Sequence, residues 1–327
     1  MQPRVFRKVS ASAMLAALVF TGCSSDNSAN AETASDQTEL REVTLGLFPS
    51  STVGAIQLGI DQGFFEDEGI DLEMLLGQGS TAQLPSLSSG SLEFMMASPT
   101  TPLLATTQGL DLKIVAGYGQ NRADIVEDSV AVLVGPDSNI QSAKDLEGKV
   151  VAINALGSIG DIGIREAIAR DGGDPDSVTF VQIGFNEVAA QLESGEIDAG
   201  MVGPPFMQQI LADGGTVISD FIQEADLAGA ELVMVSSAAL TEKDPELVAS
   251  FVRALDQTLE YAEQNQDEVR ALLPEVLDTS PEAAEKTEFL RWSAELDVEA
   301  LEQFADLMDK YDLVETRPNI EETVWVQ

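Results

Sequence analysis

Residues 43–76 read VTLGLFPSSTVGAIQLGIDQGFFEDEGIDLEMLL, and this stretch decides the fold class. Its short apolar runs at 43–48 and 72–76 predict two β-strands. Between them, apolar side chains recur from Val53 to Phe64 at close to helical spacing, and glycines mark the exit from that segment. The stretch therefore predicts a strand, a helix and a second strand in succession.

The same alternation continues along the chain in two series. The first series predicts helices at 82–89 and 102–108 and strands at 92–96 and 112–116. The second series predicts strands at 150–153, 178–183 and 197–202 and helices at 159–170 and 187–193. Such alternation indicates an α/β fold with two units, each built on a largely parallel sheet covered on both faces. After Asp244-Pro245 the pattern becomes helical.

A weak internal repeat links the two series. Residues 87–93 read LSSGSLE and residues 192–198 read LESGEID, each with a glycine where a predicted helix gives way to a strand. A glycine there can adopt the left-handed conformation that ends a helix. The repeat favours two lobes built on one plan, although an ordinary helix-to-strand junction produces the same letters by chance.

The N-terminus has the features of an export signal. Arg4, Arg7 and Lys8 precede an apolar stretch at 9–20 that is too short to span a bilayer as a mature helix. We therefore assign residues 1–22 to a signal peptide.

Cys23 follows this signal and is the only cysteine in the chain. The run Phe20-Thr21-Gly22-Cys23 is similar to a bacterial lipobox, in which the thiol receives the lipid, although Phe20 departs from the usual leucine. A plain secretory signal with an incidental cysteine is the alternative. Residues 23–42 are rich in Ser, Asn, Ala, Thr and acidic residues, which predicts a flexible tether.

Composition excludes several kinds of function. The chain carries 56 acidic and 17 basic side chains, a net charge of −39, so it repels nucleic acid and anionic lipid headgroups. It contains no histidine, so it offers no imidazole base or metal ligand and no Ser-His or Cys-His pair. We expect a non-enzyme without metal or cofactor that contacts the membrane through its lipid anchor alone. Acid–base chemistry by a carboxylate pair stays open, because carboxylates are abundant.

Five short motifs, in a fixed order, carry a family resemblance. They are AIQLGIDQGFF at 55–65, GQGST at 77–81, SGSLEF at 89–94, SAKDLEGKV at 142–150 and SGEIDA at 194–199. Together they resemble the substrate-binding proteins of ABC transporters for nitrate, sulfonate and taurine, a group that is also similar to proteins binding the pyrimidine precursor of thiamine. One departure is Gly203-Pro204-Pro205-Phe206, where many relatives have Glu-Pro. We expect no carboxylate at that place in the pocket, which disfavours a cationic or amino-bearing ligand.

The resemblance implies a type II periplasmic-binding fold, with two α/β lobes joined by two crossovers around a ligand cleft. We place the crossovers near 130–136 and 232–236, where short apolar runs lie between the units. Lobe one then takes residues 43–133 and 236–327, and lobe two takes residues 134–235. Hinge closure would capture the ligand by giving it contacts from both lobes.

Loops after the carboxyl ends of strands face the ligand in sheets of this kind. They supply hydroxyls, amides and aromatic rings, and helices that begin there direct N–H groups toward the crevice. The predicted ligand-binding residues are Phe48, Ser50, Ser51, Gly79, Ser80, Thr81, Ser98, Thr100, Tyr118, Asn154, Ser158, Phe185 and Pro204. Helix capping by the hydroxyls and core packing by the rings are equally ordinary uses of these residues. Arg122, soon after one such loop, either reaches the ligand or lies on the acidic surface.

The expected function is that of a monomeric, lipid-anchored solute-binding protein on the outer face of the cell membrane, which delivers a small oxyanion-bearing solute to ABC permease subunits. The first alternative is a binding protein for a thiamine pyrimidine precursor. An enzyme resembling those of the menaquinone pathway is an alternative of another class. A ligand sensor that docks on a receptor is a further alternative.

Overall fold

The strand predicted at 43–48 is β1 (Arg41–Leu47), which lies second from one edge of the chain's first sheet. The computed structural model describes residues 40–77, 79–122, 125 and 129–326. The predicted signal peptide, Cys23 and nearly all of the tether lie outside these residues. No helix in the described part of the chain is both long enough and apolar enough to cross a membrane.

The first sheet has six strands in the order β11-β4-β10-β3-β1-β2. Their bounds are β1 (Arg41–Leu47), β2 (Ile70–Leu76), β3 (Phe94–Ala97), β4 (Leu112–Gln120), β10 (Leu232–Ser237) and β11 (Arg291–Trp292). Strand β1 pairs in parallel with β2 and β3, whereas β10 runs antiparallel between β3 and β4. A late segment of the chain thus lies in the middle of the sheet formed by its beginning.

The second sheet has five strands in the order β7-β6-β8-β5-β9. Their bounds are β5 (Ala131–Val134), β6 (Val150–Ile153), β7 (Thr179–Gln182), β8 (Ala199–Val202) and β9 (Thr216–Ser219). Strand β6 is parallel to β7 and β8, and β5 is antiparallel to β8 and β9. The predicted α/β class is confirmed, but each sheet is mixed because a strand that returns from the other sheet runs against its neighbours.

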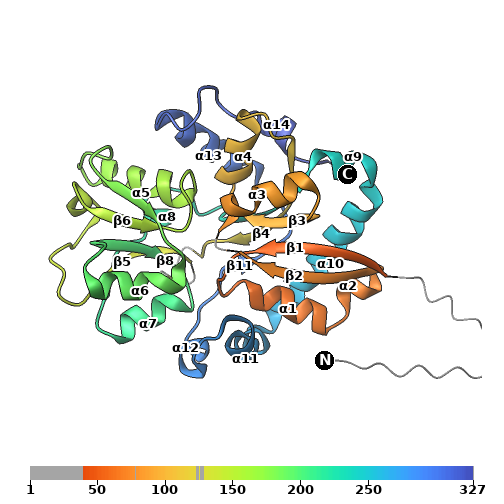
Figure 1. Ribbon diagram of the computed structural model, residues 1–327, viewed down its shortest axis with the longest axis horizontal. Coiled ribbons are helices and arrows are strands. Elements are labelled where there is room, and N and C mark those ends of the chain that lie inside the picture. Colours follow the sequence, from red (N-terminus) through yellow and green to blue (C-terminus); the bar gives the residue numbers. More distant parts are fainter. Residues whose placement is uncertain (1–39, 78, 123–124, 126–128, 327) are drawn as a thin grey trace, which may run out of the picture. The chain divides into compact units, whose positions relative to one another are not determined.

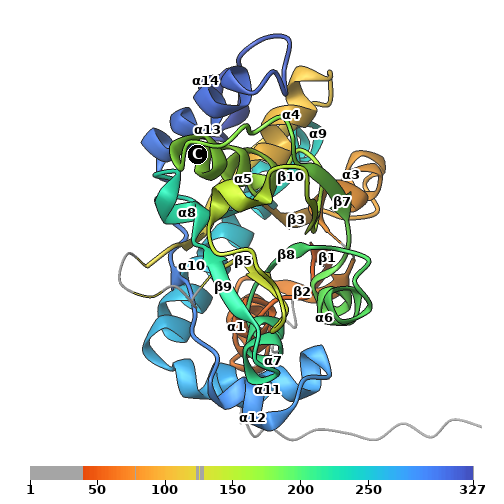
Figure 2. The same ribbon diagram turned by 90° about the vertical axis from the view of Figure 1, so that its left-hand side faces the viewer.

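Helices cover both faces of each sheet, because right-handed connections that run in opposite directions along a sheet lie on opposite faces. In the first sheet α1 (Val53–Asp61) and α2 (Phe64–Asp67) lie on one side, and α3 (Ser80–Ser89) and α4 (Thr100–Thr107) on the other (Figure 1). In the second sheet α5 (Ile159–Arg170) and α8 (Phe221–Glu224) lie opposite α6 (Phe185–Ser194) and α7 (Phe206–Ala212) (Figure 2).

The C-terminal part of the chain is helical, as expected, apart from the short strand β11. Its elements are α9 (Ala238–Lys243), α10 (Pro245–Gln264), α11 (Gln266–Leu277), α12 (Pro281–Glu285), α13 (Val298–Lys310) and α14 (Ile320–Thr323), and a 3-10 turn, η1 (Ala143–Leu146), lies earlier in the chain. Helix α10 packs against α1, and its Phe251 ring stacks on Phe94 of β3 with centroids 3.8 Å apart. This helix therefore closes the core of the first sheet.

The predicted lobe limits fall inside paired strands. Strand β5 belongs to the second sheet and β10 to the first, so the chain passes between the sheets in the connections before each of them. A buried run of four apolar residues, AVLV in β5 or LVMV in β10, has the same sequence pattern whether it links two units or belongs to a sheet. We therefore propose lobe limits just ahead of β5 and just ahead of β10.

Candidate ligand site between the two sheets

A cavity of about 40 Å³ lies where the carboxyl ends of β1, β3, β6 and β8 approach one another. Its walls come from both sheets and from the connections between them. The lining residues are Phe48, Ser50, Ser51, Thr52, Ser80, Ser98, Ser129, Val130, Asn154, Ile159, Phe185, Met201, Gly203, Pro204, Glu231, Leu232 and Leu290. A volume of this size holds water but not a solute of many heavy atoms.

The two halves of the cavity touch each other directly. The Ser51 backbone N–H donates to the Pro204 carbonyl at 3.0 Å. The rings of Phe48 and Phe185 meet edge to face with centroids 6.3 Å apart. The structure therefore describes a state in which the two walls are in contact across the cavity.

Most of the predicted ligand-binding residues line this cavity. They are Phe48, Ser50, Ser51, Ser80, Ser98, Asn154, Phe185 and Pro204. The remainder, Gly79, Thr81, Thr100, Tyr118 and Ser158, lie outside the lining. Sequence periodicity identified the loops because a strand end is visible in the pattern, but it does not determine which residue of a loop points into the cavity.

The predicted residues outside the lining lie behind or beside it. Thr100 is fully buried and shares a hydrogen bond of 2.9 Å with Ser98, while Ser158 caps α5 by accepting from the Gly160 N–H at 3.3 Å. The Tyr118 hydroxyl donates to the Thr52 carbonyl, and complete burial raises the pKa of Tyr118. Thr81 is half-buried on α3.

Gly79 lies close to the main chain of the opposite wall. A Cβ atom on Gly79 would lie 2.9 Å from the Asn154 carbonyl oxygen, well inside normal contact distance. The φ angle of Gly79 is 178°, extended backbone that any residue adopts. The glycine is thus required by the space between the two walls.

Hydroxyl groups form short pairs along the first wall. Ser80 and Thr101 share a hydrogen bond of 2.9 Å. The Ser98 hydroxyl also accepts from the Ile159 N–H at 3.1 Å, so it joins the end of β3 to the start of α5 across the cavity. These pairs fix the hydroxyl oxygens at the cavity surface, where they can donate or accept.

Glu231 and Ser129 are lining residues that sequence analysis missed. Glu231 is 4% exposed, and the Ser129 hydroxyl donates to its carboxylate. The loop at Gly203–Phe206 brings no carboxylate to the lining, but Glu231 supplies one from the connection before β10. The available signal was an acidic residue directly before the apolar run at 232–235.

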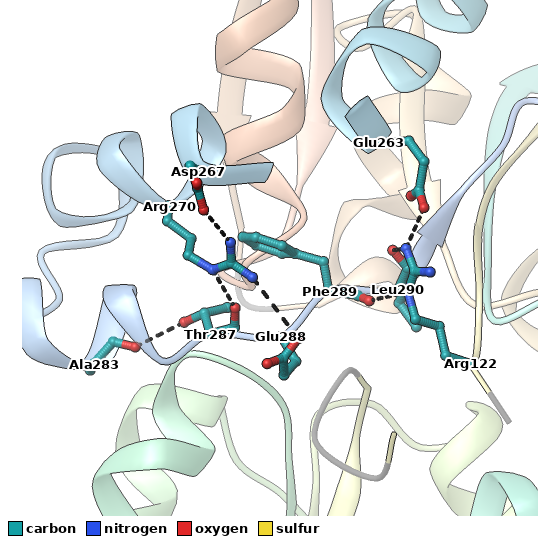
Figure 3. A network of polar contacts seen from close by, with 9 residues as sticks. All are labelled: Arg122, Glu263, Asp267, Arg270, Ala283, Thr287, Glu288, Phe289 and Leu290. Atoms are coloured by element: carbon teal, nitrogen blue, oxygen red, sulfur yellow. Dashed lines mark hydrogen bonds and ion pairs between the residues drawn. The ribbon is translucent and has the colours of Figure 1, made fainter. Parts of the chain in front are cut away.

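Arg122 lies behind the cavity wall rather than in it. Its Nε donates to the Phe289 carbonyl at 2.9 Å, and its guanidinium pairs with Glu263 (Figure 3). Arg270 holds the same segment from the other side by donating to the Thr287 carbonyl at 2.8 Å. The two arginines therefore fix the segment that presents Leu290 to the cavity.

The cavity wall contains no lysine or arginine among the residues that the structure describes. In the same part of the chain, no group of three or more His, Cys, Asp or Glu side chains could hold a metal ion. The polar groups of the described cavity wall are therefore hydroxyls, amides, main-chain groups and one carboxylate.

Comparisons with known proteins show which family this chain is similar to. The family model described as NMT1/THI5 like matches residues 51–269. The formylaminopyrimidine-binding protein of Halalkalibacterium halodurans is 26% identical over 272 residues, which cover 80% of this chain and 77% of that protein.

Solved structures show the same fold. The alkanesulfonate-binding protein SsuA from Xanthomonas axonopodis pv. citri, bound to MOPS, superposes with a TM-score of 0.75 at 20% identity, covering 87% of this chain and 98% of that one. The periplasmic nitrate-binding protein NrtA from Synechocystis superposes with a TM-score of 0.72 at 15% identity, covering 85% and 83%. The predicted periplasmic-binding fold is confirmed, and the chain belongs to the NMT1/THI5-like family.

Proposed function

We propose that this chain is the extracytoplasmic solute-binding subunit of an ABC importer and that it captures a small oxyanion-bearing solute in the cavity between its two sheets. A lipid on Cys23 would hold it at the outer face of the cell membrane, where it delivers the solute to permease subunits. The comparisons support a solute-binding role, because the homologues are ABC-type binding proteins rather than enzymes.

One observation carries the proposal: the cavity is walled by strand-end loops of both sheets, and each wall brings hydrogen-bonding groups. Ser50, Ser80 and Ser98 offer hydroxyls from the first wall, close to the starts of α1, α3 and α4. Helix N-termini add partial positive charge, which favours an oxyanion.

Capture would proceed by hinge closure. The cavity of about 40 Å³ is smaller than a typical solute, so the walls must separate before a solute enters. As the walls close around the solute, contacts such as the hydrogen bond from Ser51 to Pro204 form again or are replaced by contacts with the solute.

A binding site for a thiamine pyrimidine precursor is a second candidate. Glu231 in the cavity wall favours it, because a carboxylate accepts hydrogen bonds from the amino group of such a ring and repels an oxyanion placed beside it.

A thermal-shift screen over sulfonates, nitrate, carboxylates and aminopyrimidines tests the proposed function. A true ligand at about 100 times its dissociation constant stabilises the protein by about 2.7 kcal/mol and raises its melting temperature by several degrees. Stabilisation by none of these classes would contradict solute binding of this kind.

A further inference from the structure

We infer that the two lobes separate between the starts of α3 and α6 and turn about a polar network around Glu166, which lies on the opposite side of the cavity. The inference rests on the proposed function, because it describes how a solute would reach the cavity. It adds a direction of opening, an entry route and a residue that positions one lobe against the other.

Glu166 joins the second lobe to the first. It is a buried residue of α5, and its carboxylate accepts hydrogen bonds from Lys310 and Tyr311 at the end of α13. Helix α13 packs against α4 of the first lobe. Arg170, one turn further along α5, donates to the same carboxylate at 2.8 Å. Charge-assisted hydrogen bonds are roughly twice as strong as neutral ones, so this contact between the lobes is a strong one.

The same network reaches both connections between the sheets. Arg170 also donates to the Glu224 carbonyl at 3.0 Å and to the Asp226 carboxylate at 2.7 Å, in the connection before β10. Gln223 of that connection donates to the Asn121 side chain, in the connection before β5. The sheets cannot separate far where the chain passes between them, so groups bonded to both connections lie near the axis of rotation.

The contacts near the starts of α3 and α6 are weaker. Gly79, directly before α3, lies against the Asn154 main chain. Phe48 meets Phe185, the first residue of α6, edge to face. Each of these contacts is neutral, and it separates at less cost than a buried carboxylate held by three donors.

The strong and the weak contacts lie on different sides of the molecule. Figure 2 shows α3 and α6 toward one side of the view and α8 and α13 toward the other. Opening costs least when the weak contacts part and the Glu166 network holds. A solute therefore enters between the starts of α3 and α6.

Two pairs of spin labels test the direction of opening by double electron–electron resonance. All variants carry Cys23→Ala, so that the two introduced cysteines are the only thiols. The first pair, Ala82→Cys with Glu187→Cys, places labels at exposed positions in the first turns of α3 and α6. The second pair, Ala169→Cys with Asp309→Cys, places labels on α5 and α13 beside the polar network.

The two pairs should differ in the free protein. Because open states are populated there, we expect the distance distribution between α3 and α6 to be at least about two-fold broader than that between α5 and α13. A solute of the screen that binds, such as 1-propanesulfonate, should narrow the first distribution and shift it to shorter distance. It should leave the second distribution unchanged.

Glu166→Gln then tests the residue itself, with the labels on α5 and α13. The amide lacks the charge that holds Lys310, so this distribution should broaden about two-fold. Arg317→Gln is the matched control, because Arg317 pairs with Glu302 and Asp306 of α13 and thus acts within the first lobe. The control should leave both distributions unchanged.

Equal widths of the two distributions in the free protein, or a broader distribution between α5 and α13, would overturn the direction of opening. An unchanged distribution between α5 and α13 in Glu166→Gln would overturn the role of Glu166. If that variant fails to fold, the two label pairs without it still decide the direction. If no solute of the screen binds, the proposed function fails, whereas the widths in the free protein still decide this inference.

Discussion

Ser80 is the residue at which the binding proposal is most simply tested. Its hydroxyl lines the cavity and pairs with Thr101 at 2.9 Å. Ser80→Ala removes one neutral hydrogen bond to the solute, so the free energy of binding should weaken by about 1 kcal/mol, roughly five-fold in Kd by calorimetry. Thr241→Ala is the control, because Thr241 bonds the Ala238 carbonyl on α9, outside the lining; equal affinities for both variants would exclude Ser80 from the site.

Individual cavity residues were only partly predictable. Ser80, Ser98 and Asn154 follow strands, and strand ends are visible in the periodicity. Glu231 lies in a connection, and its place in the wall depends on how β10 returns to the first sheet. The sequence pattern does not indicate that long-range pairing.

At the scale of elements, the loop before α3 meets the end of β6 at Gly79. Gly79→Ala would place a methyl group 2.9 Å from the Asn154 carbonyl oxygen, so the walls should be held apart and solute affinity should fall about ten-fold or more. Gly135→Ala is the matched control, because a Cβ atom there meets nothing within 4 Å. Unchanged affinity of Gly79→Ala by calorimetry would contradict contact of these elements in the bound state.

Helices α5 and α13 are tied by Glu166, which accepts from Lys310, Tyr311 and Arg170. Burial alone would raise the pKa of Glu166, but these hydrogen bonds outweigh it and lower the pKa to about 2. Glu166→Gln should reduce the free energy of unfolding near pH 7 by about 1–3 kcal/mol in denaturant titrations.

The pH dependence of this difference has a defined sign. Because the folded pKa of Glu166 is depressed, the wild type's advantage is complete above about pH 5 and is lost as the pH falls toward 2. The exposed pair Glu282–Lys286 provides the control, and Glu282→Gln should cost less than about 0.5 kcal/mol. Equal losses in the two variants, or a difference that persists at pH 2, would show that Glu166 does not tie the helices.

Element type was largely predictable, whereas strand direction was not. Helix α5 occupies the predicted residues 159–170, because its apolar spacing and its Ser158 cap are both local. Strands β5 and β10 were interpreted as crossovers, since a short apolar run does not reveal which sheet it enters. The sheet that each of these strands enters depends on pairing with residues far away in the sequence.

For the whole molecule, the anchoring proposal predicts a lipid on Cys23. In a bacterial host, metabolic labelling with an alkyne fatty acid should mark the wild type and leave Cys23→Ala unlabelled, because this thiol is the only one in the chain. Label that persists on the variant would contradict the proposal.

Closure around a solute is the central claim, and small-angle X-ray scattering of the protein with and without its tightest solute tests it most directly. The cavity of about 40 Å³ cannot admit such a solute unless the walls separate, so the free protein in solution should populate an open state. We predict that saturating solute lowers the radius of gyration while the molecular mass stays constant. A tight-binding solute that leaves the scattering curve unchanged would contradict the claim.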